Sequence, residues 1–513
     1  MTRPTVLVLG DQLTRQVGPL ANARPDEVRV LMVESRALLH GAAHHAQKLV
    51  LVLAAMRRFA DALRRDGFEV AYHQHDDPAS DDFASAVHDH LRRHGAGEVT
   101  LMTPNDHGVA EPIAAAAERA GGRLRQVANE LWITDDALFD RWVEGRRTLR
   151  MEGFYREVRR ATGILMEDGE PLGGRWNYDA DNRARPDTEA SPPPPPAFEP
   201  DARVREVIKE VEAGFPHRWG EARPFRWPVD REQALRALDV FCRERLRRFG
   251  DQQDAMRVGE PFLWHSTLSV PLNLGLLHPR EVVDAALAHA EDGRRRIPTN
   301  AIEGFVRQVI GWREFVHHVY RTRGAAMHGA NALQAHAPLP PAYWGEPTQL
   351  HCLGTTVGQL RRTGYAHHIQ RLMVLGNVAQ LVGVDPEQVL AWFTATHLDA
   401  LDWVMVPNVL GMSQYADGGT MTSKPYAAGA NYLHKMSDAC AGCRFDPKAK
   451  HGEDACPLTG WYWAFIDRHQ ERFASNARMR MIVAAWRKRD AAERKRLLER
   501  AERDRAAFLA GEL

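Results

Sequence analysis

The runs TVLVLG (residues 5–10) and VRVLMV (residues 28–33) are almost entirely apolar and decide the fold class of the first part of the chain. Such runs are typical of strands that are buried on both faces of a sheet. A helical spacing of apolar residues follows over 45–67. Further strands are indicated over 68–73, 98–103 and 123–128, and further helices over 82–94 and 108–120. This alternation predicts a doubly wound parallel sheet in an α/β domain over residues 1–130.

The remaining sequence changes character twice. Residues 131–230 include five consecutive prolines at 192–196, which is typical of a long extended connection across the surface. From 231 to 513 the pattern is helical with short breaks, and the charged stretch after 474 has the pattern of an amphipathic helix. The sequence therefore predicts an α/β domain over 1–130, a linker over 131–230 and a large all-helical domain over 231–513.

Composition excludes several classes of protein. The 513 residues include 67 Lys and Arg against 67 Asp and Glu, so any contact with nucleic acid must come from a local basic patch. Five cysteines are too few for a disulfide framework. Neither a signal peptide nor an apolar run of membrane-spanning length is recognisable. The loop LGDQLT (residues 9–14) also lacks the G-x-G-x-x-G of a standard dinucleotide site. We expect a soluble, cytoplasmic and monomeric protein.

The cysteines carry the strongest chemical signal. Cys440 and Cys443 form a C-x2-C pair, Cys456 follows, and Cys352 lies far upstream. A C-x2-C pair offers two thiolates from one tight turn to a single metal centre, and a distant segment can add further thiolates. Spacing alone leaves zinc and an iron–sulfur cluster equally open. Cys242 lies in a helical pattern and is expected to be a packed thiol.

Four other segments could serve a ligand, although each also suits a bland structural role. WHSTLS at 264–269 places hydroxyl groups before a helix, where they could hold phosphates or only cap the helix. The stretch 303–320 mixes charged and aromatic residues, as many core helices do. His368 could act as a general acid, and the region 397–419 could bind a heterocycle. Trp392 and Trp344 are candidates for electron hopping.

Taken together, these segments resemble the photolyase/cryptochrome flavoproteins in kind and in order. The segments that carry the resemblance are HSTLS before PLNLG, EGFVRQVIGWREF, the His367 to Arg371 helix, and the Asp402 to Asn408 loop. Four cysteines at these positions, together with GGRWNYDADNR and LVLGDQLT, resemble the bacterial branch that carries a 4Fe–4S cluster. The resemblance covers essentially the whole chain.

This resemblance implies a bound FAD in the helical domain. The implied cofactor-binding residues are His265, Ser266, Thr267, Leu268, Ser269, Glu303, Gln308, Arg313, Arg371, Asp402 and Asn408. Residues 266–269 would hold the phosphates, and Glu303, Gln308 and Arg313 would lie along the flavin and ribityl chain. Arg371 and Asp402 would form an ion pair beside the isoalloxazine, with Asn408 facing its N5.

The same resemblance implies two further cofactors. Cys352, Cys440, Cys443 and Cys456 would bind the 4Fe–4S cluster. The antenna would be 6,7-dimethyl-8-ribityllumazine in the α/β domain, at Gly10, Asp11 and Glu34, because ligands of open α/β sheets bind at the carboxyl ends of the strands. The usual tryptophan four residues after Asn408 is replaced by Met412, so Trp392 and Trp344 would carry electrons to the flavin.

The activity implied by the resemblance is light-driven repair of UV-damaged DNA, in the manner of a (6-4) photolyase. His368 would donate a proton to the lesion, Tyr426 would line its pocket, and Arg183 would contact the DNA. Leu372 stands where animal (6-4) photolyases have a second histidine, so His368 would act alone. The main alternative is a cryptochrome, a blue-light sensor that regulates a partner without repair. A third possibility is an iron–sulfur DNA-binding protein that has lost its flavin function.

Overall fold

A computed structural model describes residues 3–146, 148–291 and 297–513. Its first part contains one parallel sheet of five strands in the order β3-β2-β1-β4-β5. The strands are β1 (Thr5–Val8), β2 (Arg29–Val33), β3 (Glu69–His73), β4 (Glu98–Met102) and β5 (Arg123–Val127). The strand order runs outward from β1 in both directions, which confirms the predicted doubly wound parallel sheet.

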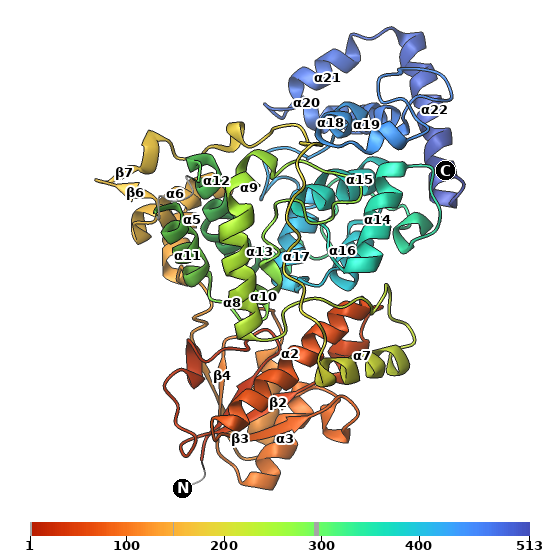
Figure 1. Ribbon diagram of the computed structural model, residues 1–513. Helices are drawn as coiled ribbons and strands as arrows, with labels where there is room; N and C mark the ends of the chain where they lie inside the picture. Colours follow the sequence, from red (N-terminus) through yellow and green to blue (C-terminus); the bar gives the residue numbers. More distant parts are fainter. Residues whose placement is uncertain (1–2, 147, 292–296) are drawn as a thin grey trace.

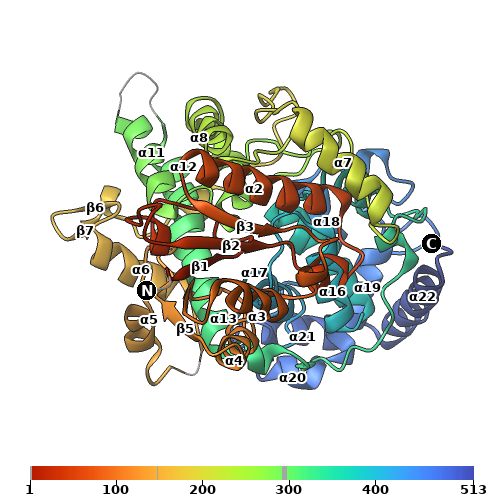
Figure 2. The same cartoon turned by 90° about the horizontal axis from the view of Figure 1, so that it is seen from below.

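The alternation of side chains along β1 explains why helices cover both faces of the sheet. Val6 and Val8 belong to the same apolar core as α2 (Ala46–Arg65), whereas Leu7 and Leu9 belong to a second core with residues of α3 and α4. Successive side chains of a strand point to opposite faces, so one apolar run supplies both cores. Figure 2 shows α2 on one side of the sheet and α3 (Phe83–His94) and α4 (Ala110–Arg119) on the other. The short α1 (Arg36–His40) follows β2.

The linker contains more regular structure than the predicted extended connection. It includes α5 (Asp136–Val143), α6 (Met151–Thr162), the hairpin β6 (Met166–Glu167) and β7 (Glu170–Pro171), and α7 (Ala202–Gly214). Phe154, Tyr155 and Val158 of α6 are fully buried and, with Met151, have the spacing of an amphipathic helix. The expected irregular path holds for the proline run at 192–196, which has no helix or strand.

The rest of the chain is helical, as predicted, and Figure 1 shows it above the sheet. Its helices are α8 (Arg231–Val240), α9 (Leu246–Gln252), α10 (Ser269–Asn273), α11 (Pro279–Glu291), α12 (Thr299–Val306), α13 (Glu314–Met327), α14 (His351–Thr363), α15 (Asn377–Val382), α16 (Pro386–Thr396), α17 (Asp402–Val406), α18 (Ala430–Met436), α19 (Pro457–Arg468), α20 (Gln470–Ala474), α21 (Arg480–Arg487) and α22 (Ala491–Ala510). Among the described residues, no helix is both long and apolar enough to cross a membrane. The domain limits at 130 and 230 stay predictions.

Among the described residues of the helical part, four segments are wound as π-helices. They are η5 (Phe241–Arg245), η6 (Arg307–Arg313), η8 (Gln370–Gly376) and η9 (Pro407–Ser413). π-Helical turns are rare and are frequent at functional sites. Gln308 and Arg313 lie in η6, Arg371 in η8 and Asn408 in η9, so three of these segments carry residues that the resemblance assigns to FAD.

Candidate functional site

A buried ion pair marks the centre of the predicted cofactor site, but its acid is not the predicted one. The Arg371 guanidinium donates to the Asp399 carboxylate at 3.0 Å. Its Nε also donates to the Ala366 carbonyl at 2.6 Å, which fixes the side chain. The predicted pairing of Arg371 with Asp402 is therefore wrong. Both aspartates lie in the same short stretch, and spacing alone could not tell which of them faces η8.

Asp402 lies instead at the contact between the helical part and the sheet domain. Asp106, which follows β4, accepts a hydrogen bond from the Trp403 amide at 2.9 Å, and Asp402 is the exposed residue beside it. Burial and the neighbouring Asp402 charge raise the pKa of Asp106 to about 8. Burial also lowers the pKa of the nearby Lys48 to about 8, although Asp399 and Asp402 partly offset this effect. These groups form a polar cluster between the strand ends and the flavin residues.

Three histidines gather next to Arg371. The rings of His265 and His367 stack at 4.4 Å, and both lie close to His368. Nε2 of His265 and both ring nitrogens of His367 are buried without a hydrogen-bond partner in the described structure. The His368 side chain is exposed, yet the protein groups around it and the Arg371 charge lower its pKa to about 4. All three imidazoles are therefore neutral at pH 7.

The segment before α10 has the shape expected of a phosphate-binding loop. Thr267 adopts a left-handed conformation with φ of 59°, and the Ser266 hydroxyl accepts a hydrogen bond from the Leu268 amide at 3.3 Å. Arg245 of η5 holds this loop from behind by donating to the carbonyls of Leu263 and His265 at 2.6 and 2.8 Å. Ser269 begins α10, so the backbone amides of the loop lie at a helix start.

Two of the predicted flavin residues are engaged mainly with the linker. Glu303 accepts hydrogen bonds from the Tyr155 hydroxyl and from the Tyr178 amide, each at 3.0 Å. The Arg313 guanidinium lies over the Trp132 ring at 3.9 Å, and burial lowers its pKa to about 10. Both side chains therefore fix the linker against the helical part, and a role along the ribityl chain stays a prediction for them.

The remaining two predicted flavin residues each have a side-chain amide oxygen that can accept a hydrogen bond from a ligand. Gln308 donates to the Gly304 carbonyl at 3.0 Å, and Asn408 donates to the Val404 carbonyl at 2.8 Å. Each bond uses the amide nitrogen and orients the amide oxygen away from its own helix. Buried polar groups normally have partners, so the unpartnered nitrogens of His265 and His367 point to a polar ligand beside them. The residues present therefore fit a polar cofactor such as FAD.

The four predicted metal-ligating cysteines come together from three segments. Cys352 of α14, Cys440, Cys443 and Cys456 line one small cavity, together with Leu350, Leu433 and Phe445. Burial and the neighbouring thiolates raise the pKa of Cys456 to about 12. Among the described residues, the Sγ atoms do not form a group of three within 4.8 Å of one another. Four thiols that line one cavity suit either a zinc ion or an iron–sulfur cluster.

The two tryptophans proposed for electron transfer connect the interior to the surface. Trp392 is fully buried and donates its Nε1 proton to the Tyr343 carbonyl at 2.9 Å. Trp344, the next residue after Tyr343, is 42% exposed. On the inner side, Trp392 lies against His397 with ring centroids 5.8 Å apart, and His397 is close to Arg371. The arrangement provides an aromatic path from the candidate cofactor site to solvent.

Arg183 and Tyr426 lie in a basic surface cluster that the sequence did not reveal. We call Arg183, Lys424 and Arg478 the basic cluster. Burial lowers the pKa of Lys424, and repulsion from the nearby Arg478 and Arg183 lowers it further. Arg183 is also paired with Asp179, which offsets part of its charge. Arg478 is held by the Ser423 hydroxyl at 2.8 Å, and Tyr426 lies beside Arg183 and Arg478. Such a cluster can bind the phosphates of a nucleic acid.

The three predicted antenna residues have different surroundings. Gly10 and Asp11 follow β1, and Asp11 accepts a hydrogen bond from Asn105 at 2.8 Å, at the strand edge that faces α17. Both oxygens of Glu34 are already engaged: Arg57 donates to each of them, and Tyr72 donates to one at 2.5 Å. Glu34 therefore holds α2 to the sheet, whereas Gly10 and Asp11 remain the predicted antenna contacts.

Sequence reasoning missed several residues for an identifiable reason. Asp399, Arg245, Lys424 and Arg478 each act through a partner that is distant in sequence, and no local motif marks them. Of these residues, Asp399 could have been considered from the sequence, because the stretch HLDALD at 397–402 contains two aspartates that could pair with Arg371.

Comparisons with known proteins agree with this site. The model of the family described as deoxyribodipyrimidine photo-lyase-related protein matches residues 6–227. A (6-4) photolyase from Agrobacterium fabrum (strain C58) is 39% identical over 485 residues, which cover 94% of this chain and 95% of that protein.

Solved structures show the same fold at low sequence identity. A bacterial class III photolyase from Agrobacterium tumefaciens is 16% identical, with a TM-score of 0.58 over 99% of this chain and 98% of its own. An archaeal photolyase from Sulfolobus tokodaii, determined with two FAD molecules, is 14% identical, with a TM-score of 0.54 over 98% of this chain and 100% of its own. The shared architecture therefore extends over both the sheet domain and the helical part.

Proposed function

This chain belongs to the photolyase/cryptochrome family, and from that premise we propose that it is a light-driven DNA-repair enzyme of the (6-4) photolyase type. The observation that carries the proposal is the near full-length match to a (6-4) photolyase at 39% identity. The geometry supports it, because His368 is exposed beside the Arg371–Asp399 pair and the unpartnered histidines. The substrate is UV-damaged DNA.

FAD is the cofactor that these residues would hold. When bound and reduced, FAD supplies the electron that opens the lesion after it absorbs blue light. The loop at 266–269 would bind the phosphates with its amides and hydroxyls, and Arg245 keeps that loop in place. The Arg371–Asp399 pair and Asn408 would border the isoalloxazine ring. His265 and His367 have nitrogen atoms available for the polar edges of the cofactor.

His368 is the residue that would move a proton. Its side chain is exposed rather than packed in the core, so it can reach a base that has been flipped out of the duplex. Its neutral ring must first take up a proton, which the negative charge of the bound DNA favours. The imidazolium would then protonate the lesion while the shared oxygen returns to its original base. Tyr426 would line the rim of this pocket.

The first test of the function is a repair assay. Purified, reduced protein under blue light should restore an oligonucleotide that carries one (6-4) lesion, and a dark sample should not. A cyclobutane-dimer oligonucleotide, run in parallel, identifies the lesion specificity. If FAD is bound and photoreducible but neither lesion is repaired, the repair proposal fails and the alternative of a blue-light-sensing cryptochrome takes its place.

Substitution of Trp392 by phenylalanine should slow the photoreduction of bound FAD at least tenfold. Phenylalanine keeps most of the packing but is much harder to oxidise, so the path from Trp392 to Trp344 would be interrupted. The measurement is the rate of flavin bleaching under blue light with an external reductant. Trp461→Phe is the matched control, because Trp461 is equally buried and donates to a carbonyl in the same way but lies in α19. Equal rates in the two variants would exclude this path.

Removal of one charge from the basic cluster should weaken DNA binding to the same extent for every DNA sequence. We expect Arg478→Gln to lower the slope of log Kd against log salt by about 0.9, as for the loss of one phosphate contact. Fluorescence anisotropy with undamaged duplex over a range of KCl concentrations measures this slope. Arg280→Gln removes an exposed arginine of α11 that pairs with Asp284, and should leave the slope unchanged. An unchanged slope in Arg478→Gln would place the DNA elsewhere.

Two further cofactors belong to the proposal. A 4Fe–4S cluster fits the cavity of the four cysteines, because four thiols from three segments line it, as such a cluster requires. A 6,7-dimethyl-8-ribityllumazine antenna would bind at Gly10 and Asp11, where the ends of β1 and β4 face the polar cluster around Lys48 and Asp402. Iron content and the fluorescence of the extracted chromophore test these assignments.

A further inference from the structure

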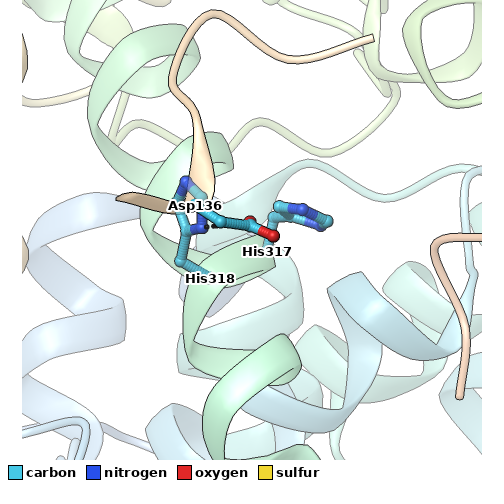
Figure 3. A group of neighbouring side chains, drawn as sticks. All are labelled: Asp136, His317 and His318. Atoms are coloured by element: carbon cyan, nitrogen blue, oxygen red, sulfur yellow. Dashed lines mark ion pairs between the residues drawn. The ribbon is translucent and has the colours of Figure 1, made fainter. Parts of the chain in front are cut away.

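Three side chains near Trp132, the residue over which Arg313 lies, are arranged as metal ligands. Asp136 is the first residue of α5 in the linker, and His317 and His318 lie in α13. One ligand atom from each lies within 4.8 Å of the other two. Figure 3 shows the Asp136 carboxylate between the two imidazole rings. We propose that these three residues bind a divalent transition-metal ion and join the linker to the helical part.

The hydrogen bonds of Thr134 determine which nitrogen of His318 is available. The Thr134 hydroxyl donates its one proton to Glu314 at 2.6 Å and lies 2.9 Å from Nε2 of His318. Burial raises the pKa of Glu314, but its carboxylate also accepts the amide protons of Thr134 and Ile133, which stabilise the ionised form. Nε2 of His318 must therefore carry the proton and donate it to Thr134. This leaves Nδ1 as a bare lone pair.

That lone pair faces another electron donor. Nδ1 of His318 lies 3.6 Å from the Asp136 carboxylate, and it is buried without a hydrogen-bond partner. Two electron-pair donors without a proton between them repel each other, whereas a cation between them would satisfy both. Nδ1 of His317 is likewise buried and without a partner, although its residue is 92% buried against Trp132. Both histidines are neutral, since burial lowers their pKa values.

Arg321 is the rival cation at this place. Its Nε lies 2.9 Å from the Asp136 carboxylate, so it satisfies the charge of that acid in part. It leaves both Nδ1 atoms without a partner, and it also pairs with Asp140, which can retain it when a metal binds. Asp136 is 61% exposed and can turn toward the histidines, so a metal ion can enter from solvent on this side.

The donor set selects the class of metal. Two imidazole nitrogens and one carboxylate suit Zn²⁺, Ni²⁺ and Cu²⁺, whereas Mg²⁺ and Ca²⁺ prefer oxygen ligands alone. Tetrahedral Zn²⁺ with bonds of about 2.0–2.1 Å places its ligands roughly 3.3 Å apart. The 3.6 Å between His318 and Asp136 is near this value, and the other separations, within 4.8 Å, must shorten on binding. Rotation of the exposed Asp136 side chain can supply most of this movement, and water can fill the remaining position.

Equilibrium dialysis of untagged, full-length holoprotein against Ni²⁺ tests the site. We expect one tight site per chain, with the iron content and the flavin absorbance unchanged. Asp136→Asn and His318→Gln should each weaken it at least tenfold. Thr134→Val should weaken it by about 10–100-fold because it frees the tautomer of His318, and Thr134→Ser should restore it.

His328→Gln is the matched control, since His328 is an exposed histidine whose Nδ1 lies 3.8 Å from Glu387. It should bind Ni²⁺ as the wild type does. The proposal is overturned if the wild type has no site tighter than the general surface histidines, or if Asp136→Asn binds Ni²⁺ as the wild type does. Because Asp136 is exposed, Asp136→Asn should fold and still measure the contribution of the carboxylate if the buried His318→Gln fails to fold.

Discussion

His368→Ala should lower the rate of (6-4) repair by about 100- to 10,000-fold, the range that a lost general acid accounts for. FAD binding and photoreduction should survive, because the Arg371–Asp399 pair and the tryptophan path do not depend on this side chain. Repair per absorbed photon and flavin bleaching are measured on the same sample. His328→Ala, at an exposed histidine of the same chain, is the control. Repair at the wild-type rate in His368→Ala would exclude its role as the proton donor.

The pH profile of repair separates proton donation by His368 from a role in packing. Its pKa in the free chain is about 4, below the usual 6.5, because the surrounding protein groups exclude water from much of the ring, although the side chain reaches the surface, and because of the Arg371 charge. A donor must be protonated, and the negative charge of bound DNA raises this pKa in the complex. Wild-type repair should therefore decline as the pH rises through the value in the complex, which lies above 4. His368→Ala should show a flat profile, and an equally flat wild-type profile would contradict the mechanism.

Cys443→Ala should prevent the formation of a stable, soluble protein. The four cysteines join the start of α14, the turn at 440–443 and the residue before α19. A structural metal centre contributes on the order of 10 kcal/mol of binding free energy, which equals the whole stability of a typical domain at about 5–15 kcal/mol. Soluble yield, iron per chain and thermal midpoint are the measurements.

The control for the cluster is Cys242→Ala. Cys242 is buried in η5, away from the other cysteines, so its loss should lower the thermal midpoint only by a few degrees, as small core truncations do. Iron content should stay at the wild-type level in this variant. If Cys443→Ala were soluble, without iron and as stable as the wild type, the cluster would have no role in holding these segments together.

The sequence predicted the strands and helices correctly where apolar residues recur at the spacing of a strand or a helix within one segment. β1, β2 and β4 could be located from short apolar runs that are buried in the sheet. The edge strands β3 and β5 are largely half-buried or exposed, and their place in the strand–helix alternation located them. The helices of the linker were missed although α6 has buried residues at helical spacing, because the glycines and prolines elsewhere in the segment dominated its interpretation. The proline run predicted the absence of regular structure correctly for the residues around it, but not for the whole linker.

The site was predictable as a set of segments but not as a set of contacts. Arg371 and the four cysteines could be named because a motif or a spacing marks each of them. The acidic partner of Arg371 could not be named, because the choice between Asp399 and Asp402 depends on how α17 contacts the sheet domain. The basic cluster is assembled from Arg183, Lys424 and Arg478, which lie far apart in sequence and have no common pattern.

The π-helical segments have a consequence for the divergence of this protein. A π-helical turn holds one residue more than an α-helical turn, and one residue turns an α-helix by about 100°. A single-residue deletion within 370–376 would therefore let the helix return to α-winding and rotate the side chains after the deletion away from their present direction. We expect related sequences to lack insertions or deletions of one residue in η6, η8 and η9, whereas the exposed turns of the linker should tolerate them.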